Sequence, residues 1–241
     1  MTEESIYLVM PAYNEEANIR AVVEQWYPTV EKLRSEGIKA VLAIANDGSK
    51  DATFSVLSGL AAQYPYLEAI DKPNSGHGAT VLYLYRHALA EGADWVFQTD
   101  SDGQTDPAEF GQLWEARSGY DLQVGHRNHR EDGLNRVVVT KVLKAVVRLT
   151  FGVSVTDANT PFRLMRADAL RSLMEQVPDD FFLANVALSA IAVKRKMRTR
   201  WLPITFRPRQ GGVNSINLRR IFKIGRKAVG DFYRINRSLG K

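Results

Sequence analysis

The stretch IYLVMPAYNEE, residues 6–16, joins a fully apolar run of five residues to a polar turn. Such a run is typical of a buried strand, and the polar residues then stand at its carboxyl end. Helical patterns follow at residues 16–35, 52–63 and 78–90. Further apolar runs lie between and after them, at residues 40–45, 67–70, 95–98 and 122–124. Strands that alternate with helices predict an α/β fold, with a mostly parallel sheet and helices on both faces.

Polar side chains follow three of the predicted strands. Their sequences are PAYNEE at residues 11–16, NDGSKD at 46–51 and TDSDGQ at 99–104. Each motif alone is typical of a turn and a helix cap. The carboxyl ends of parallel strands meet at one edge of a sheet, and α/β proteins bind their ligands there. The three motifs together therefore predict one binding crevice at that edge.

The third motif has the composition of a metal site. If the chain is extended there, Asp100, Asp102 and Gln104 project to the same side, because side chains alternate along a strand. Carboxylate and amide oxygens are the ligands that Mg²⁺ and Mn²⁺ prefer, and these ions also bind substrate phosphates. A calcium loop of the EF-hand type is excluded, since its twelfth position is Gly111 instead of a glutamate.

The charge of the chain is unevenly distributed. Its 241 residues include 32 Lys and Arg and 27 Asp and Glu, a formal net charge of +5. Residues 194–241 contain 15 basic residues and one acid, whereas residues 1–193 contain 17 basic and 26 acidic residues. An acidic body with a basic carboxyl-terminal part indicates an anionic partner. Composition leaves open whether that partner is nucleic acid, an anionic membrane surface or a phosphorylated substrate.

Composition also excludes several classes of protein. The chain has no cysteine, so it has neither a disulfide framework nor a thiolate metal site. The acidic residues near its start do not resemble a secretory leader, and no apolar run reaches the roughly 18 residues of a membrane-spanning helix. We therefore expect a cytoplasmic protein, and any contact that it makes with a membrane should be peripheral.

The carboxyl-terminal part is expected to be mainly helical. Helices are predicted at residues 135–151, 167–174 and 181–193, and strands at 162–165 and 200–206. Residues 216–237 have the pattern of an amphipathic helix with a basic polar face. We expect one domain in residues 1–215, followed by this helix in residues 216–241. The pattern leaves open whether the helix lies on anionic lipid, packs on the domain or contacts a second subunit.

Taken in order, these motifs are similar to those of the family 2 glycosyltransferases, which have the GT-A fold. NSGHGA at residues 74–79 follows the second motif, and DSDGQ at 100–104 resembles the Asp-x-Asp motif of that family. Three later motifs also resemble the family: GHR at 125–127, DANTPFR at 157–163 and FRPRQGG at 206–212. The resemblance covers residues 5–215. It fits best the branch that transfers a sugar to a polyprenyl phosphate, which includes the dolichol-phosphate mannose and glucose synthases.

The resemblance implies how the donor is bound. Pro11, Tyr13 and Glu15 would border the base and ribose of a nucleotide sugar, and Asp47 would contact the base. The family has an aspartate where this chain has Asn46. The resemblance therefore leaves open whether the donor is a UDP-sugar or a GDP-sugar.

The resemblance also implies which residues hold the metal. Asp100 and Asp102 match the Asp-x-Asp pair, with Asp102 as the main ligand of Mg²⁺ or Mn²⁺ and Gln104 as a third ligand. The cation would offset the negative charge that develops on the nucleotide diphosphate as it leaves.

Asp157 stands where the family has a carboxylate near the acceptor. If the acceptor is a saccharide hydroxyl, an inverting reaction needs a general base, and Asp157 would supply it. A phosphate acceptor is already anionic, so cationic side chains would position it and Asp157 would orient an arginine or the acceptor. The candidate cations are Arg127, Arg130, Arg136 and Arg163. Pro161 replaces a glycine of the family motif, which stiffens this turn.

The sequence therefore predicts a metal-dependent inverting glycosyltransferase that moves a sugar from a nucleotide sugar to a polyprenyl phosphate at the cytoplasmic face of the membrane. The alternative within the same class is transfer to a saccharide hydroxyl in glycan or cell-envelope synthesis. We do not expect a nucleic-acid-binding protein, because the basic part has no recognition motif and no aromatic stacking platform. A sugar-phosphate nucleotidyltransferase would have a glycine-rich loop where this chain has PAYNEE.

Overall fold

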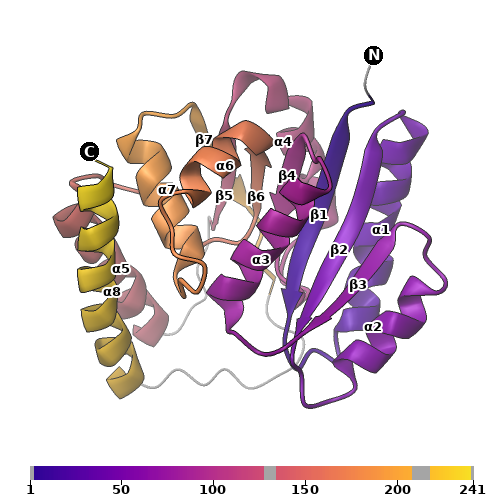
Figure 1. The fold of residues 1–241 in the computed structure, drawn as a ribbon, viewed down its shortest axis with the longest axis horizontal. Coiled ribbons are helices and arrows are strands. Elements are labelled where there is room, and N and C mark those ends of the chain that lie inside the picture. The colour runs from indigo at the N-terminus through magenta and orange to yellow at the C-terminus, as the bar shows by residue number, and fades with distance from the viewer. Residues whose placement is uncertain (1–2, 128–133, 208–217, 240–241) are drawn as a thin grey trace.

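The computed structural model describes residues 3–127, 134–207 and 218–239, with side chains for all of these except 134–140 and 218–227. The described residues form one seven-stranded sheet in the order β3-β2-β1-β4-β6-β5-β7, with helices on both faces (Figure 1). The strands are β1 (Ser5–Ala12), β2 (Lys39–Asp47), β3 (Leu67–Lys72), β4 (Trp95–Gln98), β5 (Leu122–Arg127), β6 (Arg163–Arg166) and β7 (Thr199–Ile204). Each of them overlaps a strand that the sequence predicts.

The pairing of the strands brings the polar motifs together. β1 lies between β2 and β4 and is parallel to both, and β3 is parallel to β2. The carboxyl ends of β1, β2 and β4 therefore lie side by side, as the sequence predicts. β6 runs antiparallel to β4 and β5, and β7 is parallel to β5. The sheet is thus mostly parallel, and the sequence could not give the direction of β6 because four residues have the same pattern either way.

Apolar side chains alternate between two cores, one on each face of the sheet. In β2, Val41, Ala43 and Ala45 face one core, and Leu42 and Ile44 face the other. The first core is covered by α3, α6 and α7, with α5 and α8 beside them at one end of the molecule, and the second by α1, α2 and α4 (Figure 1). The α-helices are α1 (Ile19–Ser35), α2 (Thr53–Ala61), α3 (His77–Ala90), α4 (Gly111–Glu115), α5 (Leu134–Phe151), α6 (Ala167–Met174), α7 (Ala184–Lys194) and α8 (Leu218–Ser238).

Two local differences from the prediction have physical causes. α7 begins at Ala184, because the preceding residues Phe181 and Phe182 press their backbone against the first turn of α3. A Cβ atom on Gly78 would lie 2.3 Å from the Phe181 carbonyl oxygen, so only glycine fits there. The short helix α4, with the 3₁₀ turns η1 (Pro107–Glu109) and η2 (Arg117–Gly119), was not predicted, since segments of three to five residues are too short to show a helical period.

The described end of α8 packs against the domain. Phe232 is fully buried, and its ring centroid lies 5.5 Å from those of Phe151 in α5 and Phe181. Ala228 and Ile235 are buried on the same side. Packing on the domain is therefore observed for this part of the helix, while the domain boundary expected at residue 215 lies outside the described residues. In the part of the chain that is described, we find no helix with the length and apolar character needed to cross a bilayer.

Replacing Phe232 tests how strongly α8 is held. Phe232→Ala removes a fully buried ring from the contact with α5, so we expect the free energy of unfolding to fall by about 3–5 kcal/mol in a urea titration. Tyr233→Ala is the matched control, because Tyr233 is 62% exposed and its loss should change stability by less than about 0.5 kcal/mol. Equal effects of the two substitutions would show that α8 is not anchored through Phe232.

Candidate active site

Hydrogen bonds join the first two polar motifs into one rim. Backbone amides on each side donate to side chains on the other. The pairs are Asn14 N with Ser49 Oγ (2.9 Å), Glu15 N with Thr53 Oγ1 (2.9 Å), Glu16 N with Asp51 Oδ2 (3.2 Å), Lys50 N with Asn14 Oδ1 (2.9 Å) and Ala52 N with Glu16 Oε2 (3.1 Å). Much of the polarity that marks these motifs in the sequence therefore shapes the rim itself.

The residues expected beside the nucleotide base differ in exposure. Pro11 is buried, and its carbonyl oxygen accepts a hydrogen bond from Ser101 Oγ at 2.8 Å, which ties the end of β1 to the third motif. Glu15 is also buried, and its carboxylate accepts from Asn18 Nδ2 at 2.7 Å. Tyr13 is 43% exposed. Of the three, Tyr13 has the side chain that a ligand can reach most directly, whereas Pro11 and Glu15 hold the rim in shape.

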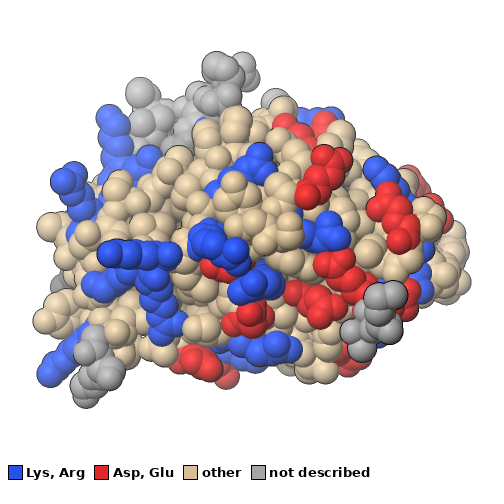
Figure 2. Space-filling model, turned by 90° about the horizontal axis from the view of Figure 1, so that it is seen from above, with Lys and Arg blue, Asp and Glu red and all other residues tan. Residues whose placement is uncertain are grey.

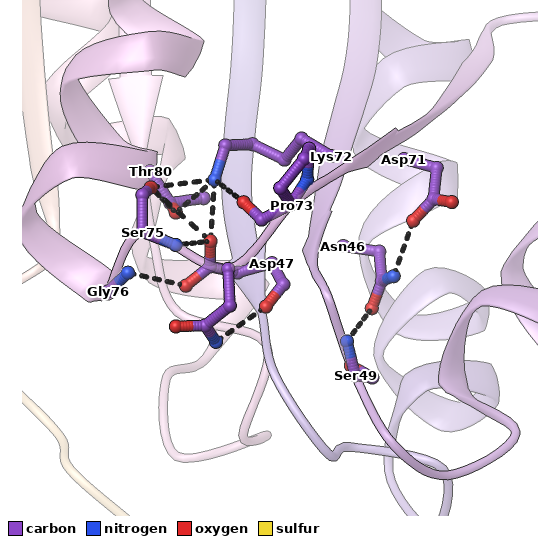
Figure 3. A network of polar contacts seen from close by, with 10 residues as sticks. Asn46, Asp47, Ser49, Asp71, Lys72, Pro73, Ser75, Gly76 and Thr80 are labelled. Carbon is purple, nitrogen blue, oxygen red and sulfur yellow. Dashed lines mark hydrogen bonds and ion pairs between the residues drawn. The ribbon is translucent and has the colours of Figure 1, made fainter.

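Asp47, the last residue of β2, lies in a polar network with the loop that leads into α3 (Figure 3). Its Oδ1 accepts from Lys72 Nζ at 2.5 Å and from the Ser75 amide at 2.8 Å, and its Oδ2 accepts from the Gly76 amide at 2.9 Å. Lys72 also donates to oxygens of Pro73, Ser75 and Thr80. Burial opposes ionisation of Asp47, but the hydrogen bonds from Lys72 and Ser75 outweigh it and hold the pKa of Asp47 below its usual value. Asp47 therefore organises this loop.

The neighbouring pair of residues explains why residue 46 is not an aspartate. In the register of β2 and β3, Asn46 lies opposite Asp71 and Asp47 lies opposite Lys72. Asn46 Nδ2 donates to Asp71 Oδ1 at 2.6 Å (Figure 3). An aspartate at position 46 would face a second carboxylate across the strands, which is destabilising. Asp71, which belongs to none of the sequence motifs, thus accounts for the asparagine at position 46.

The third motif places its carboxylates beside the start of α3. Asp100 Oδ1 lies 3.1 Å from His77 Nε2, and Asp102 Oδ1 accepts from the Gln104 amide at 3.1 Å. Desolvation works against protonation of His77, but the charge of Asp100 outweighs it and raises the pKa of His77 above its usual value. Among the described residues, no three acidic or imidazole side chains gather closely enough to enclose a metal. A cation here must therefore take further ligands from elsewhere.

The donor set nevertheless suits Mg²⁺ or Mn²⁺. Gln104 Nε2 donates to the Arg207 carbonyl oxygen at 2.9 Å, and within the described residues no group donates to Gln104 Oε1. Two carboxylates and one amide oxygen are then at hand from Asp100, Asp102 and Gln104. Mg²⁺ usually takes only one or two carboxylates from the protein and completes its shell with water and substrate phosphates. The three predicted residues fit such a cation.

Arg127 and Asp157 form a bidentate ion pair. Arg127 Nε donates to Asp157 Oδ2 at 2.9 Å, and its Nη2 donates to Oδ1 at 3.0 Å. Asp157 is buried, and the guanidinium of Arg127 lies 5.3 Å from the centroid of the Phe206 ring. A bidentate pair of this kind fixes the plane of the guanidinium and favours the ionised carboxylate. Asp157 therefore orients Arg127.

Among the candidate arginines whose side chains are described, Arg163 does not take part in this ion pair. Arg163 is fully buried, and its guanidinium donates to the carbonyl oxygens of Ala158, Thr160 and Asn185. We correct the expectation for Arg163, since these backbone contacts leave it no path to an acceptor phosphate and make it a support for the segment after Asp157. Arg130 and the side chain of Arg136 lie outside the described residues.

The sequence analysis missed Lys72 and His77. His77 lies within NSGHGA, where it was treated only as part of a motif. Lys72 ends β3 and stands two residues before the NSGHGA motif, outside it. A sequence signal existed for Lys72, because successive strands of a sheet are often neighbours, and a cation at the end of one strand can neutralise an acid at the end of the next.

The family model described as Glycosyl transferase family 2 matches residues 7–174. This chain belongs to that family. It is therefore a glycosyltransferase, as its motifs predict.

Relatives of this family 2 glycosyltransferase act on lipid phosphates, according to their names. A dolichyl-phosphate beta-glucosyltransferase of Trichomonas vaginalis is 25% identical, over 96% of this chain and 74% of the relative. An undecaprenyl-phosphate mannosyltransferase of Micrococcus luteus is 23% identical, over 88% of this chain and 87% of the relative. An undecaprenyl-phosphate 4-deoxy-4-formamido-L-arabinose transferase of Shewanella sediminis is 26% identical over 70% of this chain, which spans only half of that relative.

Solved structures share the fold of this family 2 glycosyltransferase. Glucosyl-3-phosphoglycerate synthase from Mycobacterium tuberculosis in complex with UDP has a TM-score of 0.69 at 20% identity, and covers 96% of this chain and 80% of its own. The same synthase with Mn²⁺, UDP-glucose and glycerol 3-phosphate also has a TM-score of 0.69, over the same shares of the two chains, at 19% identity. The predicted GT-A fold is thereby confirmed.

The Asp47–Lys72 pair can be tested by stability measurements on this glycosyltransferase. Lys72→Met leaves a buried carboxylate without its cation, so we expect the free energy of unfolding at pH 7 to fall by about 3–5 kcal/mol. The double variant Asp47→Asn/Lys72→Met should recover part of this loss, because no buried charge remains unpaired. A single variant as stable as the wild type would contradict this account of the network.

The same pair should make stability depend on pH. The pKa of Asp47 is lower in the folded state than in the unfolded state. The stabilisation of the fold by ionised Asp47 is therefore complete above about pH 5, and it is lost as the pH falls through the folded pKa. The difference in unfolding free energy between the wild type and Lys72→Met should therefore narrow in acid. Urea titrations across the acid range measure this, and a difference that stays constant would assign the loss to packing alone.

Proposed function

We propose that this chain is a metal-dependent, inverting glycosyltransferase that moves a sugar from a UDP-sugar or GDP-sugar to a polyprenyl phosphate at the cytoplasmic surface of a membrane. The observation that carries the choice of acceptor is the bidentate pair between Arg127 and Asp157. The names of the relatives agree with it, since the dolichyl- and undecaprenyl-phosphate transferases act on lipid phosphates.

The pair favours a phosphate acceptor over a hydroxyl for a chemical reason. A hydroxyl is a weak nucleophile and needs a base to take its proton. Asp157 is a poor base in this arrangement, because both of its oxygens accept hydrogen bonds from a permanently charged guanidinium. A phosphate oxygen is already anionic and needs only orientation and charge balance. Arg127, held in a fixed plane by Asp157, suits that task.

The donor side of the site follows from the strand-end motifs. Tyr13, whose side chain is exposed, would border the nucleotide, and the Asp47–Lys72 network fixes the loop that leads into α3. Asp100, Asp102 and Gln104 would hold Mg²⁺ or Mn²⁺, which when bound supplies positive charge opposite the departing diphosphate. The side-chain amide of Asn46 donates a hydrogen bond to Asp71. The choice between uracil and guanine therefore depends on groups other than this side-chain amide.

The membrane part of the proposal is supported by the outer surface of α5 and α8, which we call the α5–α8 surface. Exposed apolar side chains lie seven residues apart on α5, at Val142 and Leu149, and four apart on α8, at Val229 and Tyr233. Exposed basic residues surround them: Lys141, Lys144, Arg148, Arg234 and Arg237. Lys and Arg also gather at this end of the molecule in the view of Figure 2. Apolar side chains among basic ones suit the interface of an anionic bilayer.

The choice of acceptor is tested by sugar transfer with purified protein. We expect transfer from one class of nucleotide sugar to a short-chain polyprenyl phosphate and none to the corresponding polyprenol. Arg127→Met should lower transfer at least about a hundredfold, because it removes the oriented cation. Asp157→Asn should keep measurable transfer to the phosphate, since an asparagine still offers one acceptor to Arg127.

The competing acceptor gives the opposite pattern in this assay. If a saccharide hydroxyl is the true acceptor, the wild type transfers sugar to the saccharide and not to the polyprenyl phosphate. Asp157→Asn then abolishes transfer to the saccharide. That result would overturn the proposal and select the saccharide alternative.

Membrane contact is tested by flotation with lipid vesicles. We expect binding to vesicles that contain phosphatidylglycerol and little binding to neutral vesicles, with a loss of binding as salt is raised. Leu149→Asp should weaken binding about tenfold or more, because Leu149 is 84% exposed on the α5–α8 surface. Tyr83→Asp is the matched control, since Tyr83 is 40% exposed on α3 instead. Equal binding of both variants would place the lipid contact elsewhere.

A further inference from the structure

We propose that the segment Thr205–Arg207, which follows β7, positions both halves of the site. Gln104, Asp106 and Glu109 hold it on one side, and it carries the Phe206 ring beneath Arg127 on the other. In this inference, which rests on the proposed function, Glu109 and Arg207 are positioning residues for the metal and the acceptor.

Gln104 binds the backbone of Arg207 through both the amide and the carbonyl group of that residue. The Arg207 amide donates to the Gln104 carbonyl oxygen at 2.7 Å, and Gln104 Nε2 donates to the Arg207 carbonyl oxygen at 2.9 Å. The second contact decides how the side-chain amide is turned. With Nε2 held by a carbonyl oxygen, Oε1 is the atom left to face a cation, and a reversed amide would present a donor that cannot bind a metal. The Arg207 carbonyl oxygen would thus orient Gln104 Oε1 toward a bound metal.

Two acidic side chains fix the segment from the same side. Both carboxylate oxygens of Glu109 accept from the Thr205 amide, at 2.9 and 3.0 Å. Asp106 caps the turn η1 through the Ala108 amide with one oxygen and pairs with the Arg207 guanidinium through the other. Both acids lie just beyond the Asp-x-Asp motif, in the loop and turn that follow β4. The end of β7 is therefore fastened to the metal-binding loop.

The other side of the segment reaches the acceptor residues. Phe206 is partly buried in the core on the α1 face, and its ring lies under the Arg127 guanidinium at 5.3 Å. Arg127 in turn holds Asp157. One short segment therefore contacts both Gln104, the predicted metal ligand, and Arg127, the predicted acceptor arginine. Its position sets the distance between the leaving diphosphate and the attacking phosphate, and in-line displacement depends strongly on that distance.

The experiment compares variants that loosen the segment without touching a metal ligand or an acceptor residue. Glu109→Ala removes the anchor of the Thr205 amide, and Glu109→Gln keeps an acceptor oxygen for it. Arg207→Met removes the pair with Asp106 from a side chain that is 43% exposed, so this variant should fold even if Glu109→Ala does not. Glu115→Ala is the matched control, because Glu115 is exposed at the end of the neighbouring helix α4.

Two quantities are measured on each folded variant. Mn²⁺ affinity is followed by electron paramagnetic resonance of the free ion, in the presence of UDP and separately of GDP. The KM for a short-chain polyprenyl phosphate is measured in the transfer assay. We expect Glu109→Ala and Arg207→Met to weaken Mn²⁺ binding about tenfold and to raise the acceptor KM, while Glu109→Gln and Glu115→Ala stay within about threefold of the wild type.

The outcomes separate this inference from the proposed function. Asp102→Asn serves as the reference that should lose Mn²⁺ binding. If the wild type binds Mn²⁺ no better than Asp102→Asn does, the metal site of the proposed function fails, and this inference fails with it. If the wild type binds Mn²⁺ and transfers sugar, but Glu109→Ala and Arg207→Met match it in both quantities, this inference alone is overturned. A lower melting temperature without either change would also overturn it, because the segment would then only stabilise the fold.

Discussion

Several carboxylates lie at the carboxyl edge of this sheet, and a carboxylate that leaves water needs hydrogen bonds or a positive partner. Lys72 pairs with Asp47, His77 with Asp100, Arg127 with Asp157 and Arg207 with Asp106. In every case the cation comes from a segment other than that of the acid. Charge pairing therefore does more than stabilise the site, because each pair fastens one loop of the rim to another.

The pairing also explains which polar residues are left to meet a ligand. Arg163 and Glu15 are buried and bound by neighbouring groups, so they support the rim. Asp47 accepts hydrogen bonds from two backbone amides and an ammonium group. Among the described residues, the Tyr13 ring is exposed, and the side chains of Asp100, Asp102 and Arg127 are partly exposed. In the proposed function they would supply an aromatic surface for a base, ligands for a cation and a positive charge for an acceptor.

The fold places the acidic and the basic residues of the chain in different parts of the molecule. The acidic body contains the strand ends, where in the proposed function a cation would offset the carboxylates before a diphosphate approaches. The basic residues of α5 and α8 that the structure describes lie on the outside of two helices at one end of the molecule. Phe232 joins these helices to the domain, so the basic surface is held in a fixed place relative to the site.

The sequence by itself determined the α/β class, the strand positions and the meeting of three motifs at one edge. It could do so because a two-residue or 3.6-residue period and the turn residues are local properties of the chain. Only the tertiary structure decided that Asn46 donates a hydrogen bond to Asp71, that Arg163 is buried and that the segment after β7 contacts Gln104. Asn46 and Asp71 are 25 residues apart in the chain, Arg163 and Asn185 are 22 apart, and Gln104 and Arg207 are 103 apart. A side chain whose role depends on so distant a neighbour carries no local signal, and its role is fixed only when the sheet brings the two together.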